Sequence, residues 1–428
     1  MITNATIDSS LNSEQSHRIV KSKTAVSTLI SLLAVMISTY LISWLISGKQ
    51  PPPDSLLNVI YGSGLSYLVS SIFMHKLGQF PGSRPLSYLI PVVTLSTLTI
   101  IAIIIFLRLE YSRSLLVASF FIVLSISYVE FRLFQSRIKG NYAVIPFGFY
   151  KELIECSNTK FTVLPSPGFG TRAYTGLIVD NGADIPAHWQ QFIAETLSKD
   201  IPVLNSITAY ESITGKSPLD HHGEISYGEL KPAPLYLAAK RILESTLIIL
   251  SAPLTIPLIL IVATAVKIES NGPAFFVQKR VGKGGKEFSM YKIRSMCLDS
   301  EVNGAQFAGE DDPRITRIGR FIRKMRIDEM PQFLNILKGD MALIGPRPEQ
   351  ASFVKEFEQS IPLYSYRHVV RPGITGWAQV THGYAADEDE TREKLSHDFY
   401  YVKNLNLWLD LDIVFKTIKT MLTGFGAR

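Results

Sequence analysis

The feature that most constrains this chain is a long stretch that is almost without charge. Residues 25–134 hold nine charged side chains in 110 positions, whereas residues 135–428 hold 66 in 294. Charge this sparse argues against a purely soluble enzyme and also excludes disordered, collagen-like and small disulfide-rich classes. Four apolar runs of roughly 20 residues, the length that a helix needs to cross a bilayer, fill the stretch and cover 25–47, 56–76, 87–108 and 112–134.

Basic residues near the ends of these runs predict which side faces the cytoplasm. The N-terminal flank, the connection between the second and third runs, and the region after the fourth run together carry eight Lys and Arg, against three on the opposite side. Lys and Arg are enriched on the cytoplasmic side of membrane helices. We therefore expect residues 1–24 to form a cytoplasmic tail, and everything after residue 135 to face the cytoplasm.

A fifth apolar run covers residues 245–266 and holds no charge in its 22 positions. Basic residues flank it on both sides, so a crossing would place one basic cluster outside, whereas a helix that enters and returns keeps both inside. Pro253 and Pro257 lie within the run, and proline kinks a helix because it lacks an N–H and clashes with the preceding turn. We predict a bent re-entrant membrane helix over 240–267; a straight fifth span is the alternative.

The region 135–230 is typical of a small Rossmann-like α/β domain. A helix is predicted over 186–199 by apolar residues at helical spacing. A glycine-rich turn for a dinucleotide is present only as a fragment, which favours a structural or regulatory role for this domain. Strands alternating with helices predict a doubly wound sheet, with strands at 142–147, 161–164, 176–179 and 201–204.

The last region, 231–428, holds the candidate chemistry. Strands at 274–280 and 286–294 flank a glycine-rich connection and predict a β-hairpin. Alternation along the second strand places Lys292 and Arg294 on one face, where two cations can hold a diphosphate. A solvated strand edge is the other interpretation. The net charge of +6 and the pI of about 9.0 suit anionic partners, and no recognised nucleic-acid motif is present.

A basic amphipathic helix is predicted over 314–338, with Asp311-Asp312-Pro313 as its N-terminal stop. Such a helix can lie in the headgroup layer of a membrane. A later amphipathic segment, 399–423, fits either the membrane surface or the protein core.

Asp328 and Glu329 lie side by side among these arginines. A carboxylate can attack phosphorus and form a covalent acyl phosphate. Phosphates also recruit Mg²⁺, which prefers carboxylate and phosphate oxygens. An Asp-Glu pair alone is usually a solvated surface feature, and only the surrounding sequence gives this pair a functional meaning.

That surrounding sequence contains four separated motifs: KRILE at 240–244, YKIRSM at 291–296, MRIDEMPQFLNILKGDMALIGPRP at 325–348 and RPGITGWAQV at 371–380. With these motifs in this order, the chain resembles the bacterial sugar transferase family, the monotopic phosphoglycosyl transferases that act on polyprenyl phosphate. The resemblance covers about 240–428, and the preceding helices and α/β region resemble the long form of the family.

The resemblance implies a reaction and its residues. Asp328 would attack the β-phosphate of a UDP-sugar and expel UMP, and undecaprenyl phosphate would then take the sugar phosphate from the aspartate. Glu329 is implied beside it, with Mg²⁺ near both carboxylates. Arg347, in Pro346-Arg347-Pro348, would bind phosphate, and Lys292 and Arg371 match further motif positions. The product would be the first membrane intermediate of O-antigen, capsule or exopolysaccharide assembly.

The implied protein is a multi-pass enzyme of the bacterial inner membrane, with its α/β catalytic domain on the cytoplasmic face, in contact with membrane lipids and arranged as a homodimer. Two positions depart from the family pattern: Glu244 replaces an aspartate, and Ile256 replaces the serine before Pro257. A non-catalytic scaffold of glycan assembly is the alternative function. The sugar remains open among glucose, galactose and N-acetylated hexosamines.

Overall fold

The computed structural model of the chain describes residues 3–48, 53–78, 85–138, 141–156, 161–170, 172, 174–199, 201–219, 233–297, 312–361, 363–382 and 388–423. The chain divides into two compact units, Met1–Thr214 and Gly215–Arg428, and each is described by itself.

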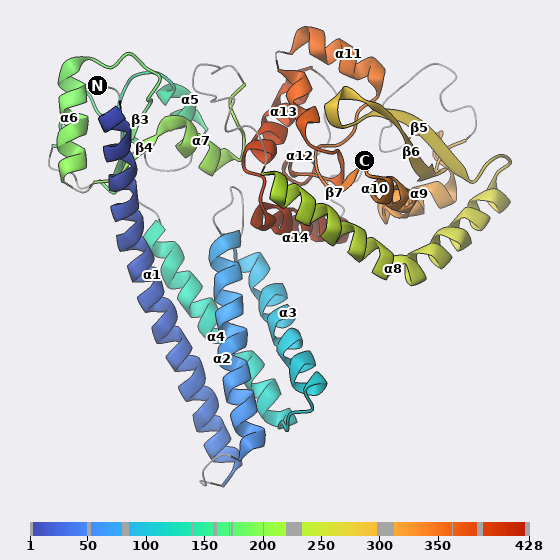
Figure 1. Cartoon of the computed structure of the whole chain (residues 1–428), viewed down its shortest axis with the longest axis horizontal. Helices are drawn as coiled ribbons and strands as arrows, with labels where there is room; N and C mark the ends of the chain where they lie inside the picture. The colour runs from blue at the N-terminus through green and yellow to red at the C-terminus, as the bar shows by residue number, and fades with distance from the viewer. Residues whose placement is uncertain are drawn as a thin grey trace. The chain divides into compact units, whose positions relative to one another are not determined.

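Four long helices open the first unit (Figure 1). Each contains a stretch apolar and long enough to cross a membrane, which agrees with the four predicted spans. Their outward side chains are large and apolar, as a lipid-facing surface requires. The helices are α1 (Thr3–Ile46), α2 (Asp54–Leu77), α3 (Pro85–Phe106) and α4 (Arg113–Ile138).

Hydrogen bonds between small polar side chains join α2 to α3 inside this bundle. The Ser66 hydroxyl lies 3.1 Å from that of Ser96 and 3.0 Å from that of Thr97, and Ser70 lies 2.7 Å from Ser96. Small residues let helix backbones approach closely, and buried hydroxyls bond across helices because the bilayer core offers them no water. These contacts fix which faces of α2 and α3 meet.

The rest of the first unit is an α/β domain built on a four-stranded sheet with the order β2-β1-β3-β4, in which every neighbouring pair is parallel. Each observed strand overlaps a predicted one, and α6 (Ala187–Ser198) confirms the predicted helix. Two short helices, α5 (Tyr150–Glu155) and α7 (Ser206–Thr214), were not predicted. The strands are β1 (Tyr142–Val144), β2 (Phe161–Val163), β3 (Gly176–Val179) and β4 (Val203–Asn205).

Ligands of open parallel sheets bind where the strand order reverses, here between β1 and β3. At that point the Asp180 carboxylate accepts hydrogen bonds from the backbone N–H groups of Phe149, 2.6 Å away, and Gly182, 2.9 Å away. The Asp180 side chain therefore satisfies backbone donors at the start of α5 and just after β3. Gly148 permits this approach: its φ is +63°, and a Cβ there would lie 2.0 Å from an Asp180 oxygen.

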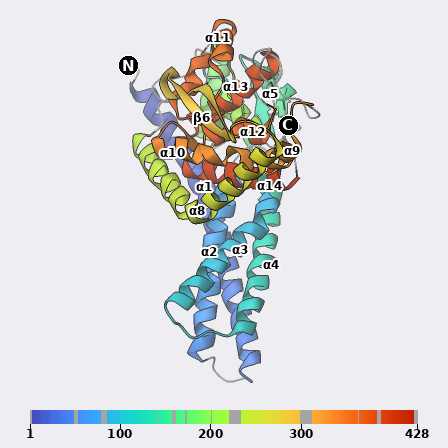
Figure 2. The same cartoon turned by 90° about the vertical axis from the view of Figure 1, so that its right-hand side faces the viewer.

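The second unit opens with α8 (Pro234–Glu269), which contains Pro253 and Pro257 and bends along its length in both views (Figures 1 and 2). Its middle is apolar and exposed, with Leu250 at 71% and Leu254 at 80%. The predicted hairpin follows as β5 (Phe275–Val281) and β6 (Glu287–Ile293), which pair antiparallel.

The prediction of one continuous helix over 314–338 is wrong. The chain forms α9 (Arg317–Lys324), then a 3₁₀ turn (Ile327–Gln332), then α10 (Phe333–Lys338). Arg326 adopts the left-handed conformation with φ +53°, and Pro331 lacks an N–H, so the α-helical ladder cannot continue. The predicted stop at residues 311–313 is also wrong, because Thr316 caps α9 by accepting a hydrogen bond from the Gly319 N–H.

A two-stranded parallel sheet, β7 (Ala342–Ile344) and β8 (Gly373–Thr375), completes the core with the helices around it. Gly345 and Gly373 let the two chains approach, since a Cβ on Gly373 would lie 2.1 Å from the Gly345 nitrogen. The predicted segment 399–423 is split between two helices, and its Tyr401 and Leu409 are fully buried in the core. The helices around the two-stranded sheet are α11 (Ala351–Ser360), α12 (Trp377–Thr381), α13 (Glu388–Lys403) and α14 (Leu407–Thr423), and segment 399–423 falls on the last two.

The contact between Gly148 and Asp180 gives a stability prediction for the α/β domain. Gly148→Ala combines a positive φ, which costs about 1–2 kcal/mol for an L-residue, with a clash against Asp180. Gly170→Ala is the matched control, because Gly170 has φ +57° but open space around its Cβ position. In thermal unfolding of the detergent-solubilised protein, we expect Gly148→Ala to lower the transition by several degrees more than Gly170→Ala. Equal shifts would contradict the clash.

Candidate active site

Asp328 and Glu329 lie in the 3₁₀ turn that separates α9 from α10, and both are buried, with exposures of 8% and 7%. The turn packs against β6, the strand that carries Lys292. The turn follows the left-handed Arg326 and places both carboxylates near this strand. We call this group the dyad cluster; it consists of Asp328, Glu329, Lys292, Arg326 and Arg347.

Glu329 is surrounded by three cations. Its Oε2 lies 3.2 Å from the Arg326 guanidinium, and its Oε1 lies 3.4 Å from the Arg347 guanidinium and 3.9 Å from the Lys292 ammonium. Burial alone raises the pKa of a carboxyl group, but the cations outweigh it and hold the pKa of Glu329 well below its usual range. Glu329 is therefore a fixed anion that gathers the cations of the cluster.

Asp328 differs from its neighbour. Among the residues that the structure describes, its carboxylate has neither an ion pair nor a hydrogen bond. Burial, and secondly the negative charge of Glu329, raise the pKa of Asp328 above the usual range of an aspartate, although Lys292, Arg323 and Arg347 oppose the shift. An unpaired, buried carboxylate beside cations is suited to act as a nucleophile toward an anionic substrate.

The structure brings together four of the residues predicted from sequence: Asp328, Glu329, Lys292 and Arg347. Burial lowers the pKa of Lys292 to about 8, although both carboxylates favour its charged form. The Arg347 side chain is partly exposed, at 34%, so it can reach a ligand as well as Glu329. Arg326 is a member that the sequence reasoning missed, although its i,i+3 spacing from Glu329 on a helical turn is a readable signal.

Arg294 was predicted to share a phosphate-binding face with Lys292, but it is not part of the dyad cluster. Its guanidinium donates to the carbonyl oxygens of Asn271, at 2.7 Å, and Ser270, at 2.8 Å, and also to the Ser270 hydroxyl. The strand ends at Ile293, so strand alternation does not extend to residue 294. The contacts of Arg294 tie the hairpin to the C-terminal end of α8.

Arg371 likewise lies apart from the dyad cluster. Its Nε donates to the Gly339 carbonyl at 2.9 Å. It lines a cleft between the start of α8 and β7, together with Lys240 and Arg241. Burial and the nearby charge of Arg241 lower the pKa of Arg371. The prediction that Arg371 binds substrate therefore concerns a second cationic surface, outside the dyad cluster.

The dyad was also predicted to hold Mg²⁺, and the donor set fits such an ion at one of the two carboxylates. Asp328 offers two unpaired hard oxygen atoms, which Mg²⁺ prefers. Glu329 would first have to give up contacts with Arg326, Arg347 or Lys292. Because Mg²⁺ commonly takes one or two carboxylates plus substrate phosphates, the arrangement suits an ion held by Asp328 and a diphosphate, with Glu329 nearby.

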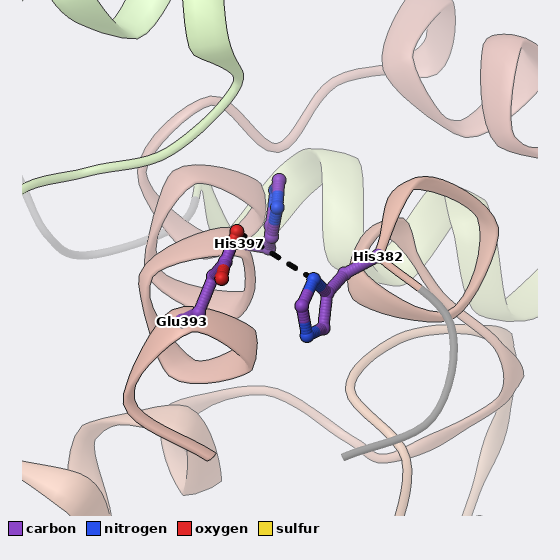
Figure 3. Close-up of side chains that lie close together, drawn as sticks. All are labelled: His382, Glu393 and His397. Atoms are coloured by element: carbon purple, nitrogen blue, oxygen red, sulfur yellow. Dashed lines mark ion pairs between the residues drawn. The ribbon is translucent and has the colours of Figure 1, made fainter. Parts of the chain in front are cut away.

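A second group of possible ligands lies just after α12 and on α13, where His382, Glu393 and His397 have ligand atoms within 4.8 Å of one another (Figure 3). The Glu393 carboxylate pairs with Lys216 and lies 3.6 Å from His382. His397 Nδ1 lies 2.9 Å from the Gly215 carbonyl, and burial lowers the pKa of His397 to about 4, so it is neutral at pH 7. These contacts tie residues 215–216 to the helices, and we assign no metal here.

Comparison with known proteins shows which family the chain belongs to. The profile of the family described as Bacterial sugar transferase matches residues 235–424. The UDP-N-acetylgalactosamine-undecaprenyl-phosphate N-acetylgalactosaminephosphotransferase of Aeromonas hydrophila is 46% identical over 373 residues, 87% of this chain and 88% of that protein. The chain therefore belongs to the bacterial sugar transferase family. A match this long includes part of the N-terminal helices, as the long form of the family requires.

Two further relatives match shorter segments. Undecaprenyl-phosphate glucose phosphotransferase of Komagataeibacter xylinus is 35% identical over 247 residues, 55% of this chain and 46% of that protein. UDP-glucose:undecaprenyl-phosphate glucose-1-phosphate transferase of Xanthomonas campestris pv. campestris is 40% identical over 191 residues, 44% of this chain and 39% of that protein.

The raised pKa of Asp328 predicts an acidic limb in the pH profile of kcat/KM. Only the ionised carboxylate is nucleophilic, so activity should fall as the pH drops through a pKa that lies above the ordinary aspartate value of about 3.9. Arg323→Gln removes a cation that favours ionisation and should move the midpoint upward by roughly half a pH unit. Arg320→Gln, which removes an exposed charge from the same helix, is the control and should leave the midpoint in place. A midpoint unmoved by Arg323→Gln would contradict this electrostatic assignment.

Proposed function

We propose that this protein transfers a sugar 1-phosphate from a UDP-sugar to undecaprenyl phosphate, releasing UMP and forming undecaprenyl-diphosphate-sugar. The observation that carries the proposal is the buried carboxylate of Asp328, which has no partner among the described residues and lies next to the cations that Glu329 gathers. The membership of the family and the named activities of its relatives support the same reaction.

The chemistry follows from the charges of the dyad cluster. A carboxylate oxygen of Asp328 forms a bond to the β-phosphorus of the UDP-sugar while the bond from that phosphorus to the bridging oxygen breaks, and UMP leaves with the electron pair. The phosphate oxygen of undecaprenyl phosphate then attacks the same phosphorus and restores the free carboxylate. Each step passes through added negative charge on phosphate oxygens, which fixed cations stabilise.

Two cations of the cluster have defined roles in this proposal. Arg347 presents a planar fork of donors that suits two phosphate oxygens at once, and Lys292 supplies a point charge from the adjacent strand. Glu329 holds both before substrate binds, so little reorganisation is needed during the reaction. A Mg²⁺ ion held by Asp328 and the diphosphate would supply further neutralisation of phosphate charge.

We also propose that α8 is the re-entrant helix and that both of its ends lie on the cytoplasmic face of the bacterial inner membrane. The bend, the two prolines and the exposed apolar middle of the helix support this topology. Helix α9 then lies at the same surface, with Phe321 exposed at 60% beside basic neighbours. A homodimer remains a prediction.

The reaction predicts a specific nucleotide product. Purified protein with undecaprenyl phosphate and Mg²⁺ should release UMP from a UDP-sugar, and release should stop in EDTA. We expect UDP-N-acetylgalactosamine to be the best donor in a panel of UDP-sugars, because the relative matched over 87% of the chain carries that name. Asp328→Asn should lower the rate by at least about 10³-fold, because it removes the attacking oxygen charge. Unchanged UMP release in this variant would refute the nucleophile, and release of UDP would indicate an ordinary glycosyltransferase.

The topology predicts a labelling pattern. The native thiols Cys156 and Cys297 are exposed, so both are first replaced by serine. Ala238→Cys and Asn271→Cys, at the two ends of α8, should then react with a membrane-impermeant maleimide only from the cytoplasmic side. Asp54→Cys, at the start of α2, is the opposite control and should react from the periplasm. Periplasmic labelling at position 271 would show that α8 crosses the membrane.

A further inference from the structure

We propose that Arg367 is a positioning residue that holds Arg347 in its working orientation by clamping the backbone of the loop that carries it. The loop runs from Ile344, the last residue of β7, to Glu349, shortly before α11. The inference rests on the proposed function, because it concerns how the phosphate-binding Arg347 is presented, and it adds a residue outside the dyad cluster to the machinery of the site.

The loop is held through its carbonyl groups, each by a separate donor. Arg367 donates to the Arg347 carbonyl at 3.0 Å, and Arg280 donates to the Pro348 carbonyl at 3.2 Å. Lys240 donates to the Ile344 carbonyl at 2.9 Å, and the Gly373 N–H donates to the Pro346 carbonyl at 2.9 Å. The donors come from four separate elements or their edges, so the main chain of the loop is fixed from several directions.

Arg367 is itself held rigidly. It is buried, with an exposure of 4%. One terminal nitrogen donates to the Tyr364 hydroxyl at 2.7 Å, and the other lies 2.8 Å from Asp398. Apolar side chains, among them Leu395 and Phe399, pack around Tyr364. A planar guanidinium with fixed partners transmits its position to the carbonyl that it contacts.

A second carboxylate completes the network. Glu349 directly follows Pro348 and lies 2.6 Å from Lys394, 3.6 Å from Arg280 and 3.9 Å from Arg367. Buried ion networks contribute little net stability compared with apolar packing of the same volume. Their value here lies in geometry, because they attach the loop to α13 on one side and to β5 on the other.

The loop carries a side chain that must be held in place and still reach the substrate. The backbone of Arg347 is clamped, whereas its side chain is 34% exposed and its guanidinium lies 3.4 Å from Glu329. A shift of about 1 Å at a substrate-positioning group can reduce a rate by about 10²-fold. Loss of the clamp should therefore weaken the contact between Arg347 and the diphosphate without removing any atom from the dyad cluster.

The test is a double-mutant cycle between the two arginines in the full-length protein. Arg367→Lys keeps the charge beside Asp398 but cannot reach Tyr364, Asp398 and the Arg347 carbonyl together. We expect KM for the UDP-sugar to rise about tenfold or more, with a smaller loss in kcat. In an Arg347→Gln background the same substitution should have almost no further effect on kcat/KM, because the group that it positions is already absent.

Arg392→Lys is the matched control, because Arg392 also donates to a carbonyl, that of Ser360, but away from the loop. It should leave KM unchanged. If Arg367→Lys does not fold, Tyr364→Phe loosens the same guanidinium and should raise KM less, again only while Arg347 is present. Additive effects in the cycle, or a loss of active enzyme with unchanged KM, would overturn the positioning role. A wild-type protein that releases no UMP from any UDP-sugar would instead overturn the proposed function.

Discussion

The site depends on one arrangement of charge, the buried carboxylate of Glu329 surrounded by Arg326, Arg347 and Lys292. Cations close together repel one another, and an anion among them lowers the electrostatic free energy of the cluster where little water is present. Because Glu329 takes these contacts, Asp328 is left without a partner among the described residues. Adjacent carboxylates thereby acquire different properties: the pKa of Glu329 is lowered by its cations, and the pKa of Asp328 is raised.

The dyad cluster is supported by a second layer of charge that lies deeper in the catalytic domain. Arg367, Arg280 and Lys240 each contact a carbonyl of the loop that carries Arg347. Their counter-ions include Asp398 on α13 and Asp410 on α14. Through these contacts α13 and α14 are linked to the backbone around Arg347.

Much of the fold was predictable because its signals are local. Charge-poor runs marked the membrane helices, short apolar runs marked the four strands of the α/β domain, and a glycine-rich connection marked the hairpin. The errors came where local periodicity was misleading. The basic stretch 314–338 has helical spacing, yet the left-handed Arg326 interrupts the helix. Arg294 was placed by strand alternation, but the strand ends at Ile293, one residue earlier.

The sequence by itself determined the membrane anchor, the α/β class and the identity of the carboxylate pair, because hydropathy, periodicity and contiguous motifs are properties of neighbouring residues. Only the tertiary structure decided which cations meet the dyad, because Lys292, Asp328 and Arg347 belong to three different elements that packing brings together. It also decided that Arg294 and Arg371 bind backbone carbonyl groups away from the dyad cluster, and that Arg367 binds the backbone carbonyl of Arg347. Contacts between residues distant in the chain depend on the path of the backbone, which no single segment encodes.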